Sequence, residues 1–421
     1  MKIEVNKREW PHIEFWRLKN GANCATSQIN GASLTCIDFW CKAGSFSELK
    51  GQEGIAHFLE HMIFKGSKNL SAGEFDQRIE ALGGSSNAAT GFDDVHFHAL
   101  VPPENINSAI KLLLNLVLYP SIHMKDFEME REVVLEEIAQ YKDQPDDQVF
   151  QHLLKNCWGT HCYGRAILGL EKSLKLTSPT TMIDFHKKHY FADNCSLAIA
   201  GDLPGDIKDY LNSSELSELN QKLDVPQSKL KKLKFQTGRE TIEIPRIECS
   251  RILMAWSIPN ANEQLTIMGI DIAASILGEG RRSRLVSRLK EELQIVEHID
   301  IELTTLEQGG ILLLEAYCSQ NNIKSVEREV DKILNDLINN EIKVEELNRA
   351  LKLISNGLFF SLESTTQISN LAGNKSLWGR KEAIHHQVEY INYWNENNLK
   401  SDIFPYFTPS KRNTLIAIPE A

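Results

Sequence analysis

The sequence predicts an α+β protein of two tandem homologous domains, each a mostly antiparallel mixed sheet covered by helices. Three observations predict this fold. The chain has 421 residues, a length that fits two or three domains. Strand-like and helix-like segments alternate along the chain, and hairpin turn signals between them imply antiparallel pairing. In addition, a stretch of the first half recurs in the second half.

Local patterns place the individual elements. Short β-rich runs near the N-terminus are separated by Asn20-Gly21 and by Asn30-Gly31, dipeptides typical of hairpin turns. Apolar periodicity predicts helices at about 53–65, 73–82, 104–118, 125–141 and 146–156, and strands at about 93–101 and 195–201. The second half should open on strands within 239–256 and continue with helices at 262–277 and 281–293. Such interleaving favours a sheet covered on one side over a doubly wound parallel fold.

An internal repeat relates residues 95–108 to residues 312–325 at a constant offset of 217 positions. In both copies a strand-like run leads through a polar turn into an amphipathic helix. A period of about half the chain indicates two homologous domains, although chance similarity between two such junctions is the alternative. We expect one domain over 1–211, a polar linker containing Pro226 over 212–235, and the second domain over 236–421.

The residues with the clearest chemistry are His57-Phe58-Leu59-Glu60-His61. On a helix the two histidines differ by about 40° around the axis, and Glu60 lies beside them. Two imidazoles at this spacing suit Zn²⁺, and a neighbouring carboxylate can take a proton from a water molecule that the metal activates. The order His-x-x-Glu-His is the inverzincin signature. The alternative is that both histidines pack on an amphipathic helix without a metal.

A catalytic zinc usually has three protein ligands, so a third donor is required. Residues 128–139 are strong helix formers with many carboxylates. Glu130 and Glu137 lie two turns apart on one face, whereas Glu136 points about 100° away from Glu137. Either Glu130 or Glu137 could ligate the metal while the other supports a ligand through a hydrogen bond. The alternative is a solvated acidic helix face.

Several segments resemble the pitrilysin-like inverzincin metallopeptidases, in particular the half-length branch that includes mitochondrial processing peptidase and its bacterial relatives. The resemblance is carried by residues 39–45, 54–67, 82–84, 87–90, 130–137, 163–165 and 200–202. It is close over about 12–205 and weak beyond. It implies that the two domains form half of a clamshell around a chamber.

The resemblance also implies a zinc-dependent endopeptidase subunit that hydrolyses unfolded peptides or short polypeptides, with one Zn²⁺ per chain. His57, His61 and Glu137 would be the metal ligands, Glu60 the general base, and Glu130 a carboxylate that supports the ligands. The substrate-binding residues would be those of an edge strand to which the peptide adds as a further strand. They are Ser86, Asn87, Ala88, Ala89 and Thr90.

The second half departs from this pattern. In many relatives an Arg and a Tyr of the second domain stabilise the oxyanion, and the aligned residues here are Lys290 and Glu297. A carboxylate beside a developing oxyanion would repel it. We therefore expect a homologous partner subunit to supply Arg and Tyr in a heterodimer, although a homodimer is possible. The repeat offset gives the second domain no metal ligands, since it places Ala274, Gly278, Leu347 and Ile354 at the corresponding positions.

Composition sets further limits. A net charge of −11 argues against nucleic-acid binding, which relies on an excess of Lys and Arg. Eight cysteines without CxxC pairs indicate a reducing compartment. The polar N-terminus is unlike a signal peptide, and no apolar run is long enough to span a membrane. We expect the cytoplasm, or an equivalent reducing space if a leader was removed. His96 and His98 alternate on a strand and lack a third donor nearby, so we interpret them as packing or surface residues.

Two other functional classes stay open. One is a catalytically inactive structural or assembly subunit of the same fold, as in the core subunits of the respiratory bc1 complex. Such subunits usually lose the zinc residues, and this chain keeps them. The other is a metal-dependent peptide-binding protein without hydrolysis.

Overall fold

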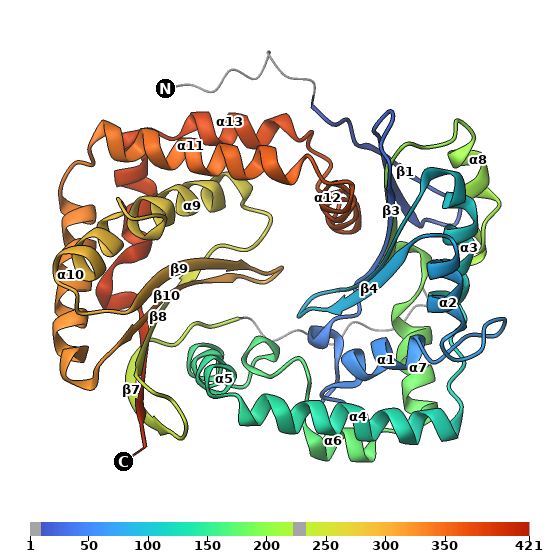
Figure 1. Cartoon of the computed structure of the whole chain (residues 1–421), viewed down its shortest axis with the longest axis horizontal. Helices are drawn as coiled ribbons and strands as arrows, with labels where there is room; N and C mark the ends of the chain where they lie inside the picture. The colour runs from blue at the N-terminus through green and yellow to red at the C-terminus, as the bar shows by residue number, and fades with distance from the viewer. Residues whose placement is uncertain (1–9, 222–232, 421) are drawn as a thin grey trace.

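The strands form two mixed sheets, one in each half of the chain. The computed structural model describes residues 10–221 and 233–420 (Figure 1). The first sheet contains β1 (Glu14–Arg17), β2 (Asn23–Gln28), β3 (Thr35–Cys41), β4 (Ser85–Thr90), β5 (Val95–Val101) and β6 (Cys195–Gly201). The second contains β7 (Gly238–Ile244), β8 (Ser250–Ile258), β9 (His298–Thr305), β10 (Gly310–Cys318) and β11 (Asn413–Pro419). The strand orders are β1-β2-β6-β3-β5-β4 and β7-β11-β8-β10-β9.

Helices make up most of the remaining described chain. In the first half they are α1 (Ile55–Ile63), α2 (Glu74–Ala81), α3 (Ile106–Leu118), α4 (Met124–Asp143), α5 (Pro145–Trp158), α6 (Glu171–Leu176), α7 (Pro179–His189) and α8 (Ile207–Asn212). In the second half they are α9 (Gln264–Gly278), α10 (Ile323–Asn339), α11 (Val344–Ser361), α12 (Thr365–Trp378), α13 (His385–Tyr393) and α14 (Glu396–Asn398). The helix expected at 281–293 is a π-helix over Val286–Glu292.

The two sheets repeat one pattern of strand pairing. β2 is parallel to β6, as β7 is to β11. β3 pairs antiparallel with β6 and β5, as β8 does with β11 and β10. The helices after β5 and β10 begin at Ile106 and Ile323, which are separated by the offset read from the sequence. The predicted α+β fold of two homologous domains is therefore confirmed.

Each sheet is covered on both faces, so the expected one-sided cover is wrong. On one face of the first sheet, Ile37 and Phe39 pack in a core with residues of α1 and α3. The opposite face is covered by α12, which comes from the second half and lies against β2, β3 and β6 (Figure 1). Small side chains allow this approach, because Ala25 and Ala198 of the sheet pack with Ala372 of α12. Reciprocally, α5 of the first half packs against β7, β8 and β11.

The two predicted hairpins have different outcomes. Asn20-Gly21 does connect the antiparallel pair β1 and β2, and Gly21 has the positive φ of 96° that such a turn requires. Asn30-Gly31 does not form a hairpin, because β6 lies between β2 and β3. β6 comes from about 165 residues further along the chain, so local turn chemistry cannot reveal it.

The expected linker is only partly visible. Residues 222–232, with Pro226, lie outside the described residues. Before them, Glu215–Glu218 form a 3₁₀ turn whose Leu216 is buried in the first core. This part of the expected linker therefore packs on the first domain. No helix in the two described segments combines the length and apolar character needed to cross a bilayer.

Candidate metal centre

Helix α1 presents the His-x-x-Glu-His motif on its polar face. Its apolar face buries Phe58, Leu59 and Met62 in the first core. The helix start is stabilised by Glu48, whose Oε1 accepts hydrogen bonds from the backbone N–H groups of Gly54 and Ala56 at 3.0 and 3.1 Å. A carboxylate at a helix N-terminus satisfies donors that have no partner within the helix. The histidines are thus held on a well-anchored helix.

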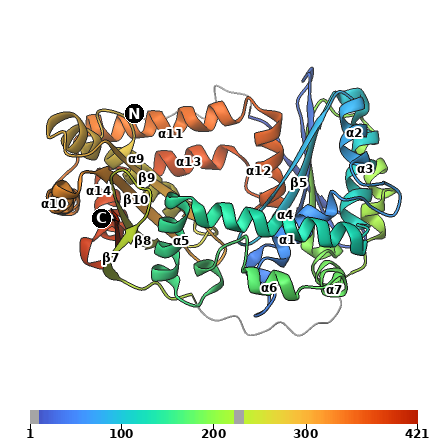
Figure 2. The same cartoon turned by 60° about the horizontal axis from the view of Figure 1, so that its bottom comes forward.

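Helix α4 brings the third donor to this face, because it packs against α1 (Figure 2). Oε2 of Glu137 lies 3.8 Å from Nε2 of His57 and 3.5 Å from Nε2 of His61. Donor atoms of the three side chains all lie within 4.8 Å of one another. The structure therefore brings together the three residues expected as ligands.

The polar atoms of this group suit a divalent metal. Oε2 of Glu137 is buried and has no hydrogen-bond partner among the described residues, and the same holds for Nδ1 of His57. Burial lowers the pKa of His57 to about 4, with a smaller contribution from His61, so His57 is neutral at pH 7. Two neutral imidazoles and a carboxylate are a ligand set that zinc prefers. A cation between them would supply the missing partner for Glu137.

Glu130 lies behind His61 and not at the centre of the group. Its Oε1 is 2.9 Å from Nδ1 of His61, and its Oε2 is 2.7 Å from Nζ of Lys65. A carboxylate that accepts the Nδ1 proton leaves the lone pair on Nε2, the nitrogen that faces Glu137. This contact distinguishes Glu130 from Glu137, which helix spacing alone could not do. The role of Lys65, which lies in the turn just after α1, was missed from the sequence.

Glu60 is joined to the edge of the first sheet. The hydroxyl of Thr90, the last residue of β4, donates a hydrogen bond to Oε2 of Glu60. Burial raises the pKa of Glu60, and the Thr90 hydrogen bond opposes that rise. A carboxyl group with a raised pKa is better suited to accept and return a proton near neutral pH.

The expected substrate-binding residues all belong to β4. This strand ends the order of the first sheet and pairs only with β5 among the described strands. Its residues alternate between exposed and half-buried, with Asn87 exposed. The side-chain carbonyl of Asn87 accepts a hydrogen bond from the backbone N–H of Ala88 at 2.9 Å. β4 thus has an unpaired backbone edge among the described strands, and its last residue, Thr90, contacts Glu60.

The second domain has apolar residues at the positions that match the ligands. Leu347 and Ala274 are buried in the second core. Lys290, in the π-helix, and Glu297, just before β9, both have exposed side chains. The described part of this domain therefore carries no His-His-Glu group at the repeated positions.

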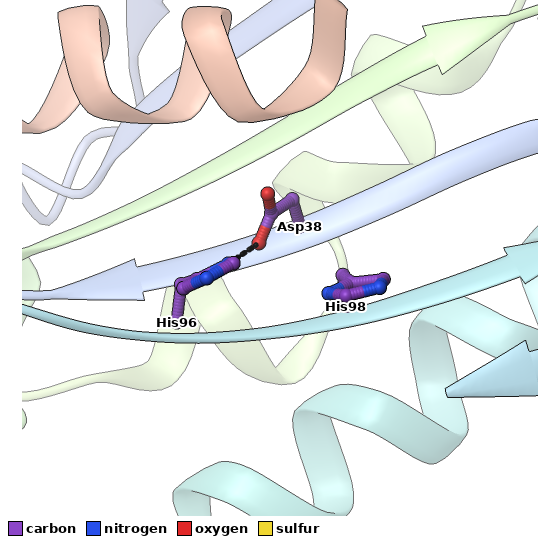
Figure 3. A group of neighbouring side chains, drawn as sticks. All are labelled: Asp38, His96 and His98. Atoms are coloured by element: carbon purple, nitrogen blue, oxygen red, sulfur yellow. Dashed lines mark hydrogen bonds and ion pairs between the residues drawn. The ribbon is translucent and has the colours of Figure 1, made fainter. Parts of the chain in front are cut away.

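One premise of the interpretation of His96 and His98 is wrong. His96 and His98 do have a third donor nearby, because β3 pairs with β5 and brings Asp38 beside them (Figure 3). Oδ1 of Asp38 lies 3.0 Å from Nδ1 of His96. Asp38 is 58 residues before His96, so sequence proximity could not indicate the group.

Comparisons with known proteins identify the family of this chain. Residues 24–171 match the family model described as insulinase, peptidase family M16, and residues 178–354 match the model described as the peptidase M16 inactive domain. The chain belongs to peptidase family M16. An uncharacterized zinc protease from Rickettsia bellii is 27% identical over 378 residues, covering 89% of this chain and 90% of that protein.

Two solved structures have the same fold. A protease from Helicobacter pylori superposes with a TM-score of 0.89 at 22% identity, covering 97% of this chain and all of that one. A chain of complex III2 from Candida albicans superposes with a TM-score of 0.79 at 17% identity, covering 96% of this chain and 95% of that one. The fold is half of the M16 clamshell, as the resemblance implied.

Proposed function

We propose that this chain is a zinc-dependent endopeptidase subunit in which His57, His61 and Glu137 hold one Zn²⁺. The observation that carries the proposal is the buried Oε2 of Glu137, which lacks a hydrogen-bond partner among the described residues and faces Nε2 of both histidines. A buried carboxylate oxygen between two imidazole nitrogens is costly without a cation. The relatives named zinc proteases support the choice of zinc.

A zinc ion bound there would polarise a water molecule and the carbonyl group of a peptide bond. Glu60 takes the proton of the attacking water and later returns it to the departing amine. The Thr90 hydroxyl holds Oε2 of Glu60, which leaves Oε1 to accept the proton. Glu130 keeps the Nδ1 proton of His61 in place, so the Nε2 lone pair stays directed at the metal position.

The substrate in this proposal is an extended peptide that adds to the free edge of β4. Backbone hydrogen bonds to residues 86–90 supply affinity with little demand on sequence. The contact between Thr90 and Glu60 sets the distance from this edge to the proton acceptor. Pairing with β4 requires a free extended segment. Unfolded peptides and short polypeptides offer such a segment, whereas a folded protein does not.

The active form is a heterodimer with a homologous partner that supplies the Arg and Tyr oxyanion donors. The presence of Lys290 and the acidic Glu297 at the aligned positions, both exposed, supports this part of the proposal. The isolated chain then binds zinc and cleaves peptides slowly. Rapid turnover by the isolated chain would contradict the requirement for a partner.

The compartment in this proposal is a reducing one, such as the cytoplasm. All eight cysteines lie within the described residues and carry free thiols. Six of them are buried, namely Cys24, Cys36, Cys41, Cys157, Cys195 and Cys318.

A Glu60→Gln variant tests the catalytic assignment against the structural and peptide-binding alternatives. Zinc content and cleavage of fluorogenic peptides are measured for the wild type, for Glu60→Gln, and for Glu80→Gln, which changes an exposed acid on α2. Each protein is assayed alone and with the partner chain that co-purifies from the native source. We expect Glu60→Gln to keep its zinc and lose turnover by several orders of magnitude, while Glu80→Gln behaves as the wild type. Equal turnover in all three, or none in the wild type with its partner, would contradict the proposal.

A further inference from the structure

A second group of possible metal ligands lies on the opposite face of the first sheet from α1. Asp38 is on β3, and His96 and His98 are on β5 (Figure 3). The intervening residues Phe39 and Phe97 pack in the core with α1. Since side chains alternate along a strand, the three polar residues point to the face that α12 covers. The group is therefore separated from His57, His61 and Glu137 by the sheet itself.

Strand register brings the three side chains together. Asp38 is directly opposite His98, and His96 is two residues away on the same face. One donor atom from each residue lies within 4.8 Å of the other two. A tetrahedral zinc with bonds of about 2.0–2.1 Å holds its ligand atoms about 3.3 Å apart. The 3.0 Å between Asp38 Oδ1 and His96 Nδ1 needs only a small opening to admit such an ion.

The imidazole rings are held in place by packing. The ring of His96 stacks on Trp40 with centroids 4.4 Å apart, and the rings of His96 and His98 lie nearly parallel, 5.8 Å apart. Trp40 is fixed in turn by α12, where the space beside Gly373 is filled by the indole ring. Rigid positioning of ligands lowers the cost of ordering them around an ion.

The Asp38 carboxylate and Nδ1 of His98 are buried with few polar partners. Asp38 is 1% exposed, and His96 is its only ion-pair partner in the described part of the chain. Nδ1 of His98 is buried and has no hydrogen-bond partner among the described residues. A simple Asp38–His96 pair would leave that nitrogen unexplained. A cation bound by all three residues would satisfy both the carboxylate and the nitrogen.

We propose that Asp38, His96 and His98 form a second metal site, which takes a divalent transition metal and joins β3 to β5. Two imidazoles and one carboxylate should bind such metals in the general affinity order, in which Cu²⁺ exceeds Ni²⁺ and Zn²⁺. His98 is opposite Asn87 of β4, so the ion reinforces the strand that supports the free edge. Binding stabilises the folded chain by an amount that rises with the logarithm of metal concentration over the dissociation constant, once that ratio is well above one.

The test uses a parent chain that carries His57→Ala and His61→Ala, so the first centre contributes no imidazole ligands. Cu²⁺ binding is measured by calorimetry, ligand nitrogens by electron paramagnetic resonance, and stability by thermal unfolding with and without Cu²⁺. We expect one Cu²⁺ per chain with two imidazole nitrogens and a raised unfolding midpoint. Adding His98→Phe should weaken binding at least tenfold and abolish the rise.

A matched control separates this site from His385, His386 and Glu389, a third group of possible donors, on α13. The parent with His385→Gln and His386→Gln should bind Cu²⁺ as the parent does. Full binding in the His98→Phe protein, or loss of binding in the control, would overturn the proposal. If His98→Phe does not fold, copper-catalysed oxidation of the parent is mapped by mass spectrometry. Oxidation at His96 and His98 supports the site, and oxidation elsewhere refutes it. Because the parent lacks the first centre, these results are independent of the proposed protease function.

Discussion

Glu130 accepts a hydrogen bond from Nδ1 of His61 across a distance of 2.9 Å, and this contact determines which nitrogen of His61 faces Glu137. The other oxygen of Glu130 pairs with Lys65 at 2.7 Å. Two helices that are far apart in sequence are thereby tied together behind the candidate metal centre. The orientation of His61 depends on a carboxylate that does not itself reach the metal position.

The first prediction concerns this supporting contact. Glu130→Gln should weaken zinc affinity about 10- to 100-fold, because the carboxylate that orients a ligating histidine is lost. Competition with a chromophoric chelator measures the affinity. Glu136→Gln changes an exposed acid on the same helix and should leave the affinity unchanged. Equal affinities for the two variants would contradict a positioning role for Glu130.

The second prediction concerns Thr90. Thr90→Val removes the hydroxyl that donates to Glu60 while keeping the shape and the β-branched side chain. A hydrogen bond to a charged group contributes about 1.5–3 kcal/mol, so kcat should fall roughly 10- to 100-fold with zinc content unchanged. Thr90→Ser keeps the donor and should retain most of the activity. Identical losses in both variants would assign the effect to strand packing instead.

The third prediction concerns the contact between the two domains. The hydroxyl of Tyr163 donates to Oδ1 of Asp93 at 2.6 Å and accepts from the backbone N–H of Gln308 at 3.2 Å. Tyr163→Phe removes both bonds, and urea denaturation should show a loss of about 1–3 kcal/mol. Tyr393→Phe alters an exposed tyrosine and should change stability by less than about 0.5 kcal/mol.

The fourth prediction concerns the packing of α12 on the first sheet. A Cβ at Gly373 would come within 2.3 Å of the Trp40 ring. Gly373→Ala should therefore destabilise the protein by about 1–3 kcal/mol through overpacking. Gly357→Ala, on α11, would meet nothing within 4 Å and should stabilise by about 1 kcal/mol through helix propensity. Thermal unfolding of the pair checks the opposite signs.

The fifth prediction concerns the pH dependence of stability. His186 is buried and its ring lies 2.9 Å from the carbonyl oxygen of Val117, and burial lowers its pKa from 6.5 to about 4. The unfolded chain takes up a proton below about pH 6.5 that the folded chain resists, so the stability from this group is present above pH 6.5 and is lost toward pH 4.

His186→Gln, which does not titrate, should therefore lose less stability on acidification than the wild type. Between pH 7.5 and pH 5 the difference should be roughly 2 kcal/mol, from about 1.4 kcal/mol for each pH unit below 6.5. Urea denaturation at both pH values, with a chelator present throughout, measures it. Parallel changes in the two proteins would contradict a neutral buried His186.

Local sequence patterns were sufficient to predict the features that depend on residues close together in sequence. Helix periodicity placed His57, Glu60 and His61 on one face of α1, and the repeat offset related β5 and α3 to β10 and α10. The roles of the acids on α4 could not be separated by spacing, because Glu130 and Glu137 lie on the same face of one helix. Their difference arises from contacts with α1.

The features missed from the sequence all depend on distant pairing. β6 lies between β2 and β3, so Asn30-Gly31 connects strands that do not pair with each other. Helix α12, from the second half, packs on the first sheet and covers a face that was expected to be open. Asp38 meets His96 and His98 only because β3 and β5 pair. In each case the contacting segments are tens of residues or more apart in sequence, so local sequence patterns do not predict the contact.

The most direct test of the zinc centre is an anomalous difference map, collected at the zinc edge from crystals grown with Zn²⁺. We predict a peak bonded to Nε2 of His57, Nε2 of His61 and the carboxylate of Glu137 at about 2.0–2.2 Å. A map without a peak between these three side chains, or one in which they point away from a common centre, would contradict the account.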